Sequence, residues 1–182
     1  MTDWNPHRFG PRFRPNKVTH FDDGTSVIAL AQKDGSVLPC YIDTADYDLV
    51  KGYRWRAYPS NKTFYAMTHV YVGGVRTTVR MHQLLMPLSD GRTCDHRNRH
   101  GLDCRKNNLR PANASQQNAN RRRPSNNMLG HKGVIRLREG RAFRAYVSKS
   151  GKQIVVGEFT RLDDAVAARG SAAKESYGEF AI

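Results

Sequence analysis

The sequence predicts an α+β fold made of short strands and few helices. Between residues 18 and 80, runs of β-branched and aromatic residues alternate with glycine-containing turns. Residues 115–122 form a short polar segment that follows a capping asparagine, which favours a helix. After residue 130, three more strand-like runs precede a segment with an apolar stripe at helical spacing. Runs of strands followed by a helix are typical of α+β domains.

The first seventeen residues carry three prolines and several arginines and show no periodicity. Such a composition predicts a flexible basic arm over 1–17. The arm either contacts a phosphate backbone or is a simple disordered tail, and the sequence leaves both open.

Residues 18–80 are expected to form a β-rich N-terminal module. Its last two strand-like runs are separated only by Gly73-Gly74, which predicts a tight hairpin. Four aromatic residues of this module are candidates for base stacking, but in an alternating strand pattern we expect them in the core. They are Trp55, Tyr58, Phe64 and Tyr65.

Residues 81–123 hold the polar residues that carry chemistry. A short apolar helix with His82 is expected first, followed by a strand that ends at Asp95-His96. A loop through Gly101 leads to a second strand that contains Asn108, and Asn113 is the expected cap of a helix over 115–122. A Gln-Gln-Asn cluster begins that helix, so that it offers amide oxygens close to its start.

These residue types suit metal-assisted hydrolysis of a phosphodiester. Mg²⁺ prefers carboxylate and amide oxygens and keeps several waters, so one or two protein ligands suffice. Asp95 and an amide near position 117 meet that need. Histidine titrates near neutral pH and can take a proton from an attacking water, which is the role expected of His96.

This stretch resembles the His-Asn-His (HNH) endonucleases, in particular the type common in phage homing endonucleases. The resemblance extends to Arg80-Met81-His82 and to the run at 43–57, and it covers nearly the whole chain from about Val18. It implies a ββα-metal nuclease core at 81–123 that holds one Mg²⁺ or Mn²⁺ per active site. It also implies cleavage of double-stranded DNA that leaves 5′-phosphate and 3′-hydroxyl ends. One active site cuts one strand, so a monomer would nick the duplex and a homodimer could break both strands.

The resemblance also implies individual roles. Asp95 corresponds to the first metal ligand, His96 to the general base and Asn108 to the asparagine that bridges the loop. The second metal ligand is either Gln117, which stands where the family usually has Asn, or its neighbour Asn118. His82 is expected to be a packed residue that supports the site. Cys104 and Gln83 also depart from the family pattern, and the departures leave a non-catalytic, sequence-specific DNA-binding protein with a decayed HNH site as the alternative.

A zinc site is the alternative interpretation of the same stretch. The four side chains that would form it are Cys94, His96, His100 and Cys104. Their spacing lacks the tight Cys-x-x-Cys pair of most zinc sites, and zinc would consume the expected base, so zinc is disfavoured.

Residues 124–129 have the composition of a linker, and 130–182 are expected to form a three-stranded antiparallel sheet packed on one helix. The expected strands are 134–138, 142–148 and 153–159. The expected helix starts at Thr160 with a capping box to Asp163 and ends at Gly178. Gly170 inside this helix predicts a close approach to a strand.

This segment resembles the APETALA or ethylene-response-factor type of DNA-binding domain. Gly133-Val134, Arg144-Ala145, Gly157-Glu158-Phe159 and the alanines up to Gly178 carry the likeness, whereas Phe143 and Arg169 depart from it. The likeness implies that the sheet binds DNA. The basic residues expected to contact DNA are Arg110, Arg121, Arg122, Arg136, Arg138, Arg141, Arg144 and Lys152.

The charge distribution agrees with a polyanionic partner. The chain has a formal net charge of +14, and the excess lies after residue 50: 5 basic and 7 acidic side chains precede it, against 25 and 9 beyond it. Such a field suits duplex DNA and makes binding depend on salt. An RNA partner remains an alternative.

No apolar stretch approaches the length of a membrane span. Three cysteines without a pairing pattern indicate a reducing compartment, so we expect a cytoplasmic protein. A monomer and a homodimer are equally compatible with the sequence.

Overall fold

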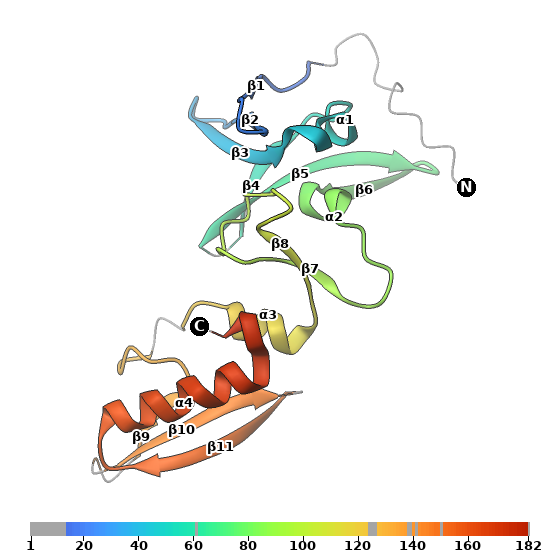
Figure 1. Cartoon of the computed structure of the whole chain (residues 1–182). Coiled ribbons are helices and arrows are strands. Elements are labelled where there is room, and N and C mark those ends of the chain that lie inside the picture. The colour runs from blue at the N-terminus through green and yellow to red at the C-terminus, as the bar shows by residue number, and fades with distance from the viewer. Residues whose placement is uncertain are drawn as a thin grey trace. The chain divides into compact units, whose positions relative to one another are not determined.

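The computed structural model describes residues 14–60, 62–123, 127–137, 140, 142–149 and 151–181. These residues form small, mostly antiparallel sheets and four α-helices, so the predicted α+β class is confirmed (Figure 1). Contacts divide the chain between Pro111 and Ala112 into unit 1, which precedes this point, and unit 2, which follows it.

The first sheet of unit 1 has the order β1-β2-β3 and is antiparallel throughout. Its strands are β1 (Val18–His20), β2 (Thr25–Ala31) and β3 (Val37–Asp43). A 3₁₀ turn (Thr44–Asp46) and the short helix α1 (Tyr47–Val50) follow directly. The sequence did not predict these helical turns, because a single turn is too short to show a helical period.

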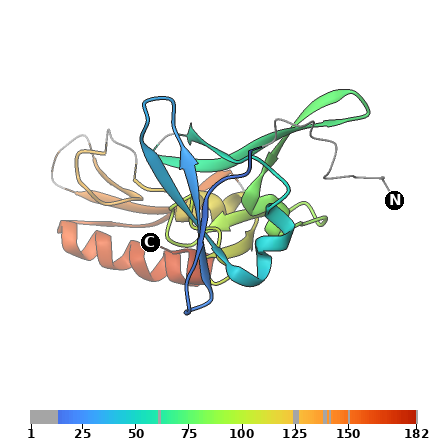
Figure 2. The same cartoon turned by 90° about the horizontal axis from the view of Figure 1, so that it is seen from above.

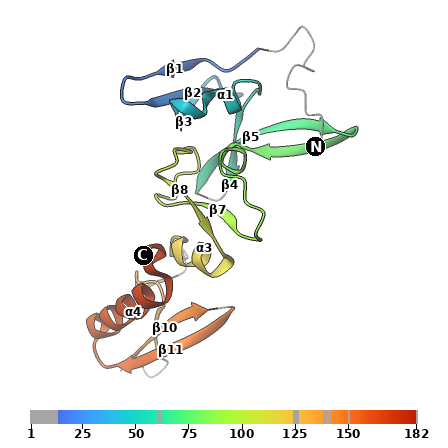
Figure 3. The ribbon, with the colours of Figure 1, turned by 45° about the vertical axis from the view of Figure 1, so that its right-hand side comes forward.

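The second sheet of unit 1 has the order β4-β5-β6. Its strands are β4 (Arg56–Ser60), β5 (Thr63–Val72) and β6 (Val75–Arg80). Val72 lies opposite Val75, and Gly73 and Gly74 both have positive φ, at 56° and 82°. The predicted tight hairpin is therefore confirmed, and glycine suits both turn positions. The hairpin extends away from the rest of unit 1 (Figures 2 and 3).

Helix α2 (Met81–Leu85) and the two sheets enclose the core of unit 1. Trp55 is 2% exposed, and its indole Nε1 donates to the Val50 carbonyl at 3.0 Å, so the only polar atom of that side chain is satisfied. The expectation of a core position is correct for Trp55 and wrong for Phe64, which is 38% exposed near the end of its sheet. Tyr58 and Tyr65 are half-buried.

Two short strands follow in unit 1, and only the last residue of the second, Ala112, belongs to unit 2. They are β7 (Thr93–His96) and β8 (Leu109–Ala112), which pair in a two-stranded sheet. Asn108 was expected inside the second strand but immediately precedes it. The reason is local: the Asn108 amide donates to the Arg105 carbonyl and closes a turn there.

Helix α3 (Ala114–Asn120) begins unit 2. Asn113 is its N-cap, as predicted, and the Asn113 and Gln116 side chains form a capping box. The division of the chain falls inside the segment 81–123, because Ala112 and Ala119 pack with Val147 and Tyr177 in a separate core cluster.

The rest of unit 2 is an antiparallel sheet of order β11-β10-β9 with helix α4 packed on one side (Figure 1). Its strands are β9 (Val134–Arg136), β10 (Phe143–Lys149) and β11 (Lys152–Phe159). The helix α4 (Leu162–Tyr177) is followed by a 3₁₀ turn (Gly178–Phe180). The predicted sheet and helix are present, and Gly178 ends the helix as expected.

Two predictions for α4 are wrong. The N-cap is Arg161 rather than Thr160, and it makes no side-chain capping bond, so no capping box to Asp163 forms. A Cβ on Gly170 would meet nothing within 4 Å, so this glycine does not approach a strand. The close approach lies instead at Gly133, where a Cβ would fall 2.5 Å from the Tyr146 carbonyl oxygen.

Among the described residues, no helix combines the length and the apolar composition that a membrane crossing needs.

Candidate active site

Asp95 and His96 are the last two residues of β7. Because neighbouring residues of a strand point to opposite faces, the two side chains have different surroundings. The Asp95 side chain is 12% exposed, whereas His96 is 5% exposed. Their positions are set by the pairing of β7 with β8 and by the loop that joins these strands.

Asn108 ties that loop together. Its Oδ1 accepts from the Asn98 amide at 3.0 Å, and its Nδ2 donates to the Asp103 carbonyl at 2.7 Å. The Arg97 amide donates to the Asn108 carbonyl at 2.9 Å. Asn108 is 6% exposed and is therefore a structural bridge that fixes the chain leaving His96.

Asp103 strengthens the same loop from inside. Its carboxylate accepts from Asn98 Nδ2 at 2.8 Å and from Arg105 Nε at 2.8 Å. Burial alone would raise the pKa of Asp103, but the hydrogen bonds and the Arg105 charge outweigh it and lower this pKa. The loop is therefore held by an ionised carboxylate as well as by the Asn108 amide.

Arg110 lies against Asp95. Its Nε donates to Asp95 Oδ2 at 2.9 Å, and the Arg110 side chain is only 4% exposed. Arg110 was expected to hold a phosphate, but in this structure it is buried and positions the Asp95 carboxylate. A carboxylate offers about four lone-pair sites, and the bond from Arg110 Nε occupies one of those on Asp95.

His96 packs among aromatic and sulfur side chains. Its ring centroid lies 4.9 Å from that of His82, edge to face, and 5.6 Å from that of Tyr65. Cys40 and burial raise the pKa of Cys104 well above the usual value, and a hydrogen bond with His96 acts in the opposite direction. Cys104 is therefore a neutral thiol beside the candidate base.

His82 is 6% exposed and lies beside His96 and Tyr65. Burial, with smaller effects from His96 and Arg80, lowers the pKa of His82 to about 3. His82 is consequently neutral at physiological pH and adds no positive charge next to His96.

The metal-binding capacity of this region rests on few ligands. Among the described residues, no three His, Cys, Asp or Glu side chains lie close enough together to hold a metal ion. This applies also to Cys94, His96, His100 and Cys104, the four candidate zinc ligands. The Asp95 carboxylate, next to the candidate base in the sequence, is half-buried and accepts a hydrogen bond from Arg110. That donor set fits Mg²⁺, which keeps several waters, better than a metal that needs an all-protein shell.

The expected amide ligands lie on α3, in unit 2. Gln117 is half-buried and Asn118 is exposed. Arg121 and Arg122, which follow the helix, are both exposed. Lys132 Nζ donates to the carbonyls of Asn118, Ala119 and Arg121 at 2.6 to 2.7 Å, so it caps the C-terminal end of α3.

The expected DNA-contacting residues of the C-terminal sheet differ in their surroundings. Arg136 is exposed and its guanidinium lies 5.3 Å from the centroid of the Phe143 ring. Arg144 pairs with Glu158 at 2.6 Å, and Lys152 is exposed at the start of β11. Arg138 and Arg141 lie outside the described residues.

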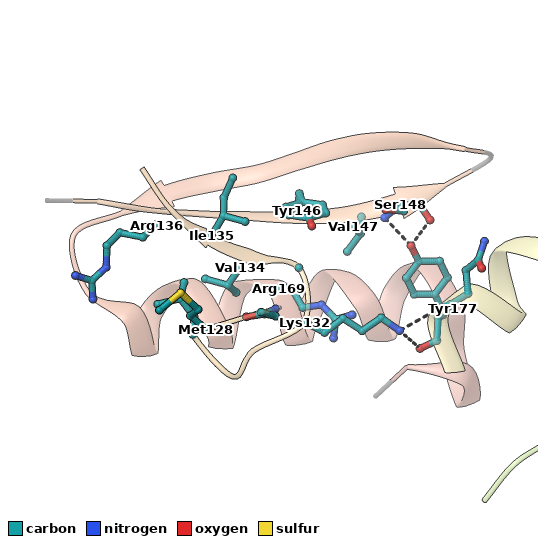
Figure 4. A pocket seen from close by; sticks show the side chains of 15 residues that line it. Met128, Lys132, Val134, Ile135, Arg136, Tyr146, Val147, Ser148, Arg169 and Tyr177 are labelled. Carbon is teal, nitrogen blue, oxygen red and sulfur yellow. Dashed lines mark hydrogen bonds between the residues drawn. The ribbon is translucent and has the colours of Figure 1, made fainter. Parts of the chain in front are cut away.

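Unit 2 also contains a pocket of about 860 Å³ between its sheet, α4 and the segment after α3 (Figure 4). Tyr177 closes one end of it, where its hydroxyl bonds to the Ser148 backbone (Figure 4). Arg169 lies in the wall, and Gly133 leaves room for it, because a Cβ there would fall 2.9 Å from Arg169 Nε.

Sequence patterns missed one member of the candidate site, Tyr65, and one contact, the ion pair between Arg110 and Asp95. Tyr65 was assigned to the core, and its contact with His96 joins residues from distant parts of the chain. One feature of the sequence could have predicted the contact between Arg110 and Asp95, because both residues lie in strands that were expected to be neighbours.

A comparison of the chain with protein-family models, with curated proteins and with solved structures finds no match in any of the three.

Proposed function

We propose that this protein is a metal-dependent DNA endonuclease of the HNH class that nicks duplex DNA. The observation that carries the proposal is the Asp95-His96 pair at the end of β7, followed by a loop that Asn108 bridges on both sides. A carboxylate, an imidazole and a loop-fixing amide in this order are what hydrolysis with one metal ion requires.

His96 is proposed as the general base. It takes a proton from the water that attacks the phosphorus, and the 3′-oxygen leaves to give 5′-phosphate and 3′-hydroxyl ends. Tyr65, His82 and Cys104 surround its ring and restrict its orientation. A base held in one orientation loses less entropy when it reacts.

Asp95 would hold the metal ion, with Gln117 or Asn118 as the second ligand proposed from the sequence. When bound, a divalent cation neutralises charge that develops on the phosphate. The part of Arg110 is to fix Asp95 in one rotamer.

The test is cleavage of supercoiled plasmid by purified protein in Mg²⁺, in Mn²⁺ and in EDTA. We expect metal-dependent conversion to open circles by the wild type and none by His96→Ala. His131→Ala, in unit 2, is the matched control and should cut normally. Cleavage by His96→Ala at the wild-type rate would refute the assignment of the base.

A non-catalytic DNA-binding protein is the second candidate. Two observations favour it: His96 is only 5% exposed, and Asp95 is already bound by a buried arginine. This candidate predicts DNA binding without conversion of plasmid in any metal. The same plasmid assay, with a binding measurement beside it, separates the two.

A further inference from the structure

The sheet β4-β5-β6 has one face in the core and one face open to solvent. Ala66, Thr68 and Val70 alternate along β5 and are buried. The opposite face has the intervening residues, and the register places Met67 between Arg56 and Arg80. We name this second face the open face. Its polar and aromatic residues are Arg56, Tyr58, Tyr65, His69, Tyr71, Arg76, Thr78 and Arg80.

The open face carries positive charge, and its sheet contains no acidic side chain that would neutralise it. Arg56, Arg76 and Arg80 are all exposed. Within the described part of the chain, none of the three forms an ion pair. Residues 49–89 contain 6 Lys and Arg and no Asp or Glu, so no carboxylate from this segment offsets the charge.

Hydrogen bonds across the strands organise the middle of the open face. His69 Nε2 lies 3.2 Å from the Tyr58 hydroxyl, and His69 Nδ1 lies 3.1 Å from Thr78 Oγ1. These bonds join β4, β5 and β6. Tyr71, toward the hairpin turn, is 73% exposed and lies opposite Arg76. Arginine, tyrosine and threonine side chains of this kind are common donors to phosphate oxygens.

The open face continues to the candidate active site. Tyr65 lies on the same side of β5 as Met67, His69 and Tyr71, because residues two apart share a face. Its ring centroid is 5.6 Å from that of His96 and 5.3 Å from that of His82. From Tyr65 to Tyr71 the strand spans roughly 20 Å, which corresponds to about six nucleotide steps along one DNA strand.

We propose that the open face binds the phosphate backbone of duplex DNA next to the scissile bond and leads that strand to His96. The inference rests on the proposed function and adds a binding surface to it. The three arginines contact successive phosphates, and Tyr65 marks the end of the surface at the candidate base. The DNA-binding surface of the protein is then not limited to the C-terminal sheet.

The experiment compares two triple variants that change the net charge equally. The open-face variant is Arg56→Gln, Arg76→Gln and Arg80→Gln. The control variant is Lys33→Gln, Lys51→Gln and Lys174→Gln, which are exposed residues outside this sheet and outside the predicted DNA contacts. Affinity for a 40-base-pair duplex is measured in EDTA at several salt concentrations, and circular dichroism checks that each variant is folded.

We expect the open-face variant to lower affinity on the order of 100-fold at 150 mM salt and to reduce the salt slope by about 2.7, since each B-DNA phosphate contact contributes about 0.9. The control should change both by much less. Equal losses in the two variants would overturn the proposal, because only net charge would then matter. Duplex RNA and phosphatidylserine vesicles are tested as competing ligands. The proposal would also be overturned if the open-face variant lost affinity for one of these ligands and not for duplex DNA.

Binding in EDTA does not depend on cleavage, so the two proposals fail separately. A wild type that nicks plasmid while the open-face variant binds normally refutes only the open face. A wild type that never nicks, together with a reduced slope in the open-face variant, refutes only the nuclease. Hydroxyl-radical footprinting adds position: the open-face variant should lose protection on one side of the nick site.

Discussion

At the scale of single residues, the candidate site contains a charged side chain, Arg110, that is buried together with its ion-pair partner. Arg110 and Asp95 form an ion pair in which the arginine is almost fully enclosed. An enclosed pair is costly to break, because the remaining charge loses its partner and cannot recover water.

Arg110→Met should therefore destabilise the protein by about 3 kcal/mol in urea unfolding. The double variant Asp95→Asn with Arg110→Met should recover much of that loss, since no unpaired charge remains. Arg92→Met is the matched control, because Arg92 pairs with Asp90 at a surface site where both side chains are 48% exposed. No measurable change is expected there, and a loss equal to that of Arg110→Met would contradict the argument from burial.

The second residue-level prediction concerns pH. Burial lowers the pKa of His82 to about 3, below the ordinary histidine value of 6.5. The unfolded chain therefore binds a proton that the folded chain does not take up, so His82 contributes stability above pH 6.5 that is lost as pH falls. The free energy of unfolding should drop by about 1.4 kcal/mol per pH unit in this range from His82 alone.

Thermal unfolding of the wild type and of His82→Gln between pH 7 and pH 5 measures this contribution. Other titrating groups are common to both proteins, so the difference between their pH dependences reports His82. Identical pH dependences would show that His82 takes up a proton as readily in the folded chain as in the unfolded chain.

At the scale of elements, the cap of α3 follows from the local sequence, whereas the surroundings of two glycines follow from tertiary packing. Asn113 and Gln116 form the capping box of α3, and both lie within one turn. Gly133 is closely surrounded by other atoms, whereas Gly170 faces open space. The sequence pattern had predicted a close approach to a strand at Gly170 and none at Gly133.

Gly170→Ala should stabilise the protein by about 1 kcal/mol, because the position lies inside α4, faces open space and gains helix propensity. Gly133→Ala should destabilise it, because the φ of Gly133 is +73° and a Cβ would meet the Tyr146 carbonyl at 2.5 Å. Thermal unfolding of both variants tests the pair. A destabilising Gly170→Ala would restore the original expectation of a close contact.

At the scale of the whole molecule, the formal charge of +14 favours association with a polyanion such as the proposed DNA ligand. Counterion release makes the affinity of such a chain for DNA depend strongly on salt, whatever the sequence of the duplex. Under the two proposals, the open face of unit 1 and the C-terminal sheet of unit 2 would each contribute phosphate contacts.

Affinity for a non-specific duplex should accordingly fall at least about 10³-fold between 50 and 200 mM salt. Fluorescence anisotropy with a labelled duplex measures it. A nearly flat salt dependence would show that the excess charge does not face the ligand, and it would count against both proposals.

The sequence by itself determined the features that arise within a few residues. The Gly73-Gly74 turn, the Asn113 cap, the helix end at Gly178 and most of the long strands follow from backbone preferences and from alternation. It missed the single helical turn of α1 and misplaced the cap of α4, since a single turn has no detectable period and several residues could serve as the cap.

Only the tertiary structure decided which distant residues meet. Tyr65 lies beside His96, Arg110 binds Asp95, and an exposed arginine face continues from β5 to the candidate base. These contacts depend on how sheets and loops pack. Local propensity does not predict these contacts, because the residues that meet are far apart in the chain. They are brought together when apolar side chains of other residues are buried in the core.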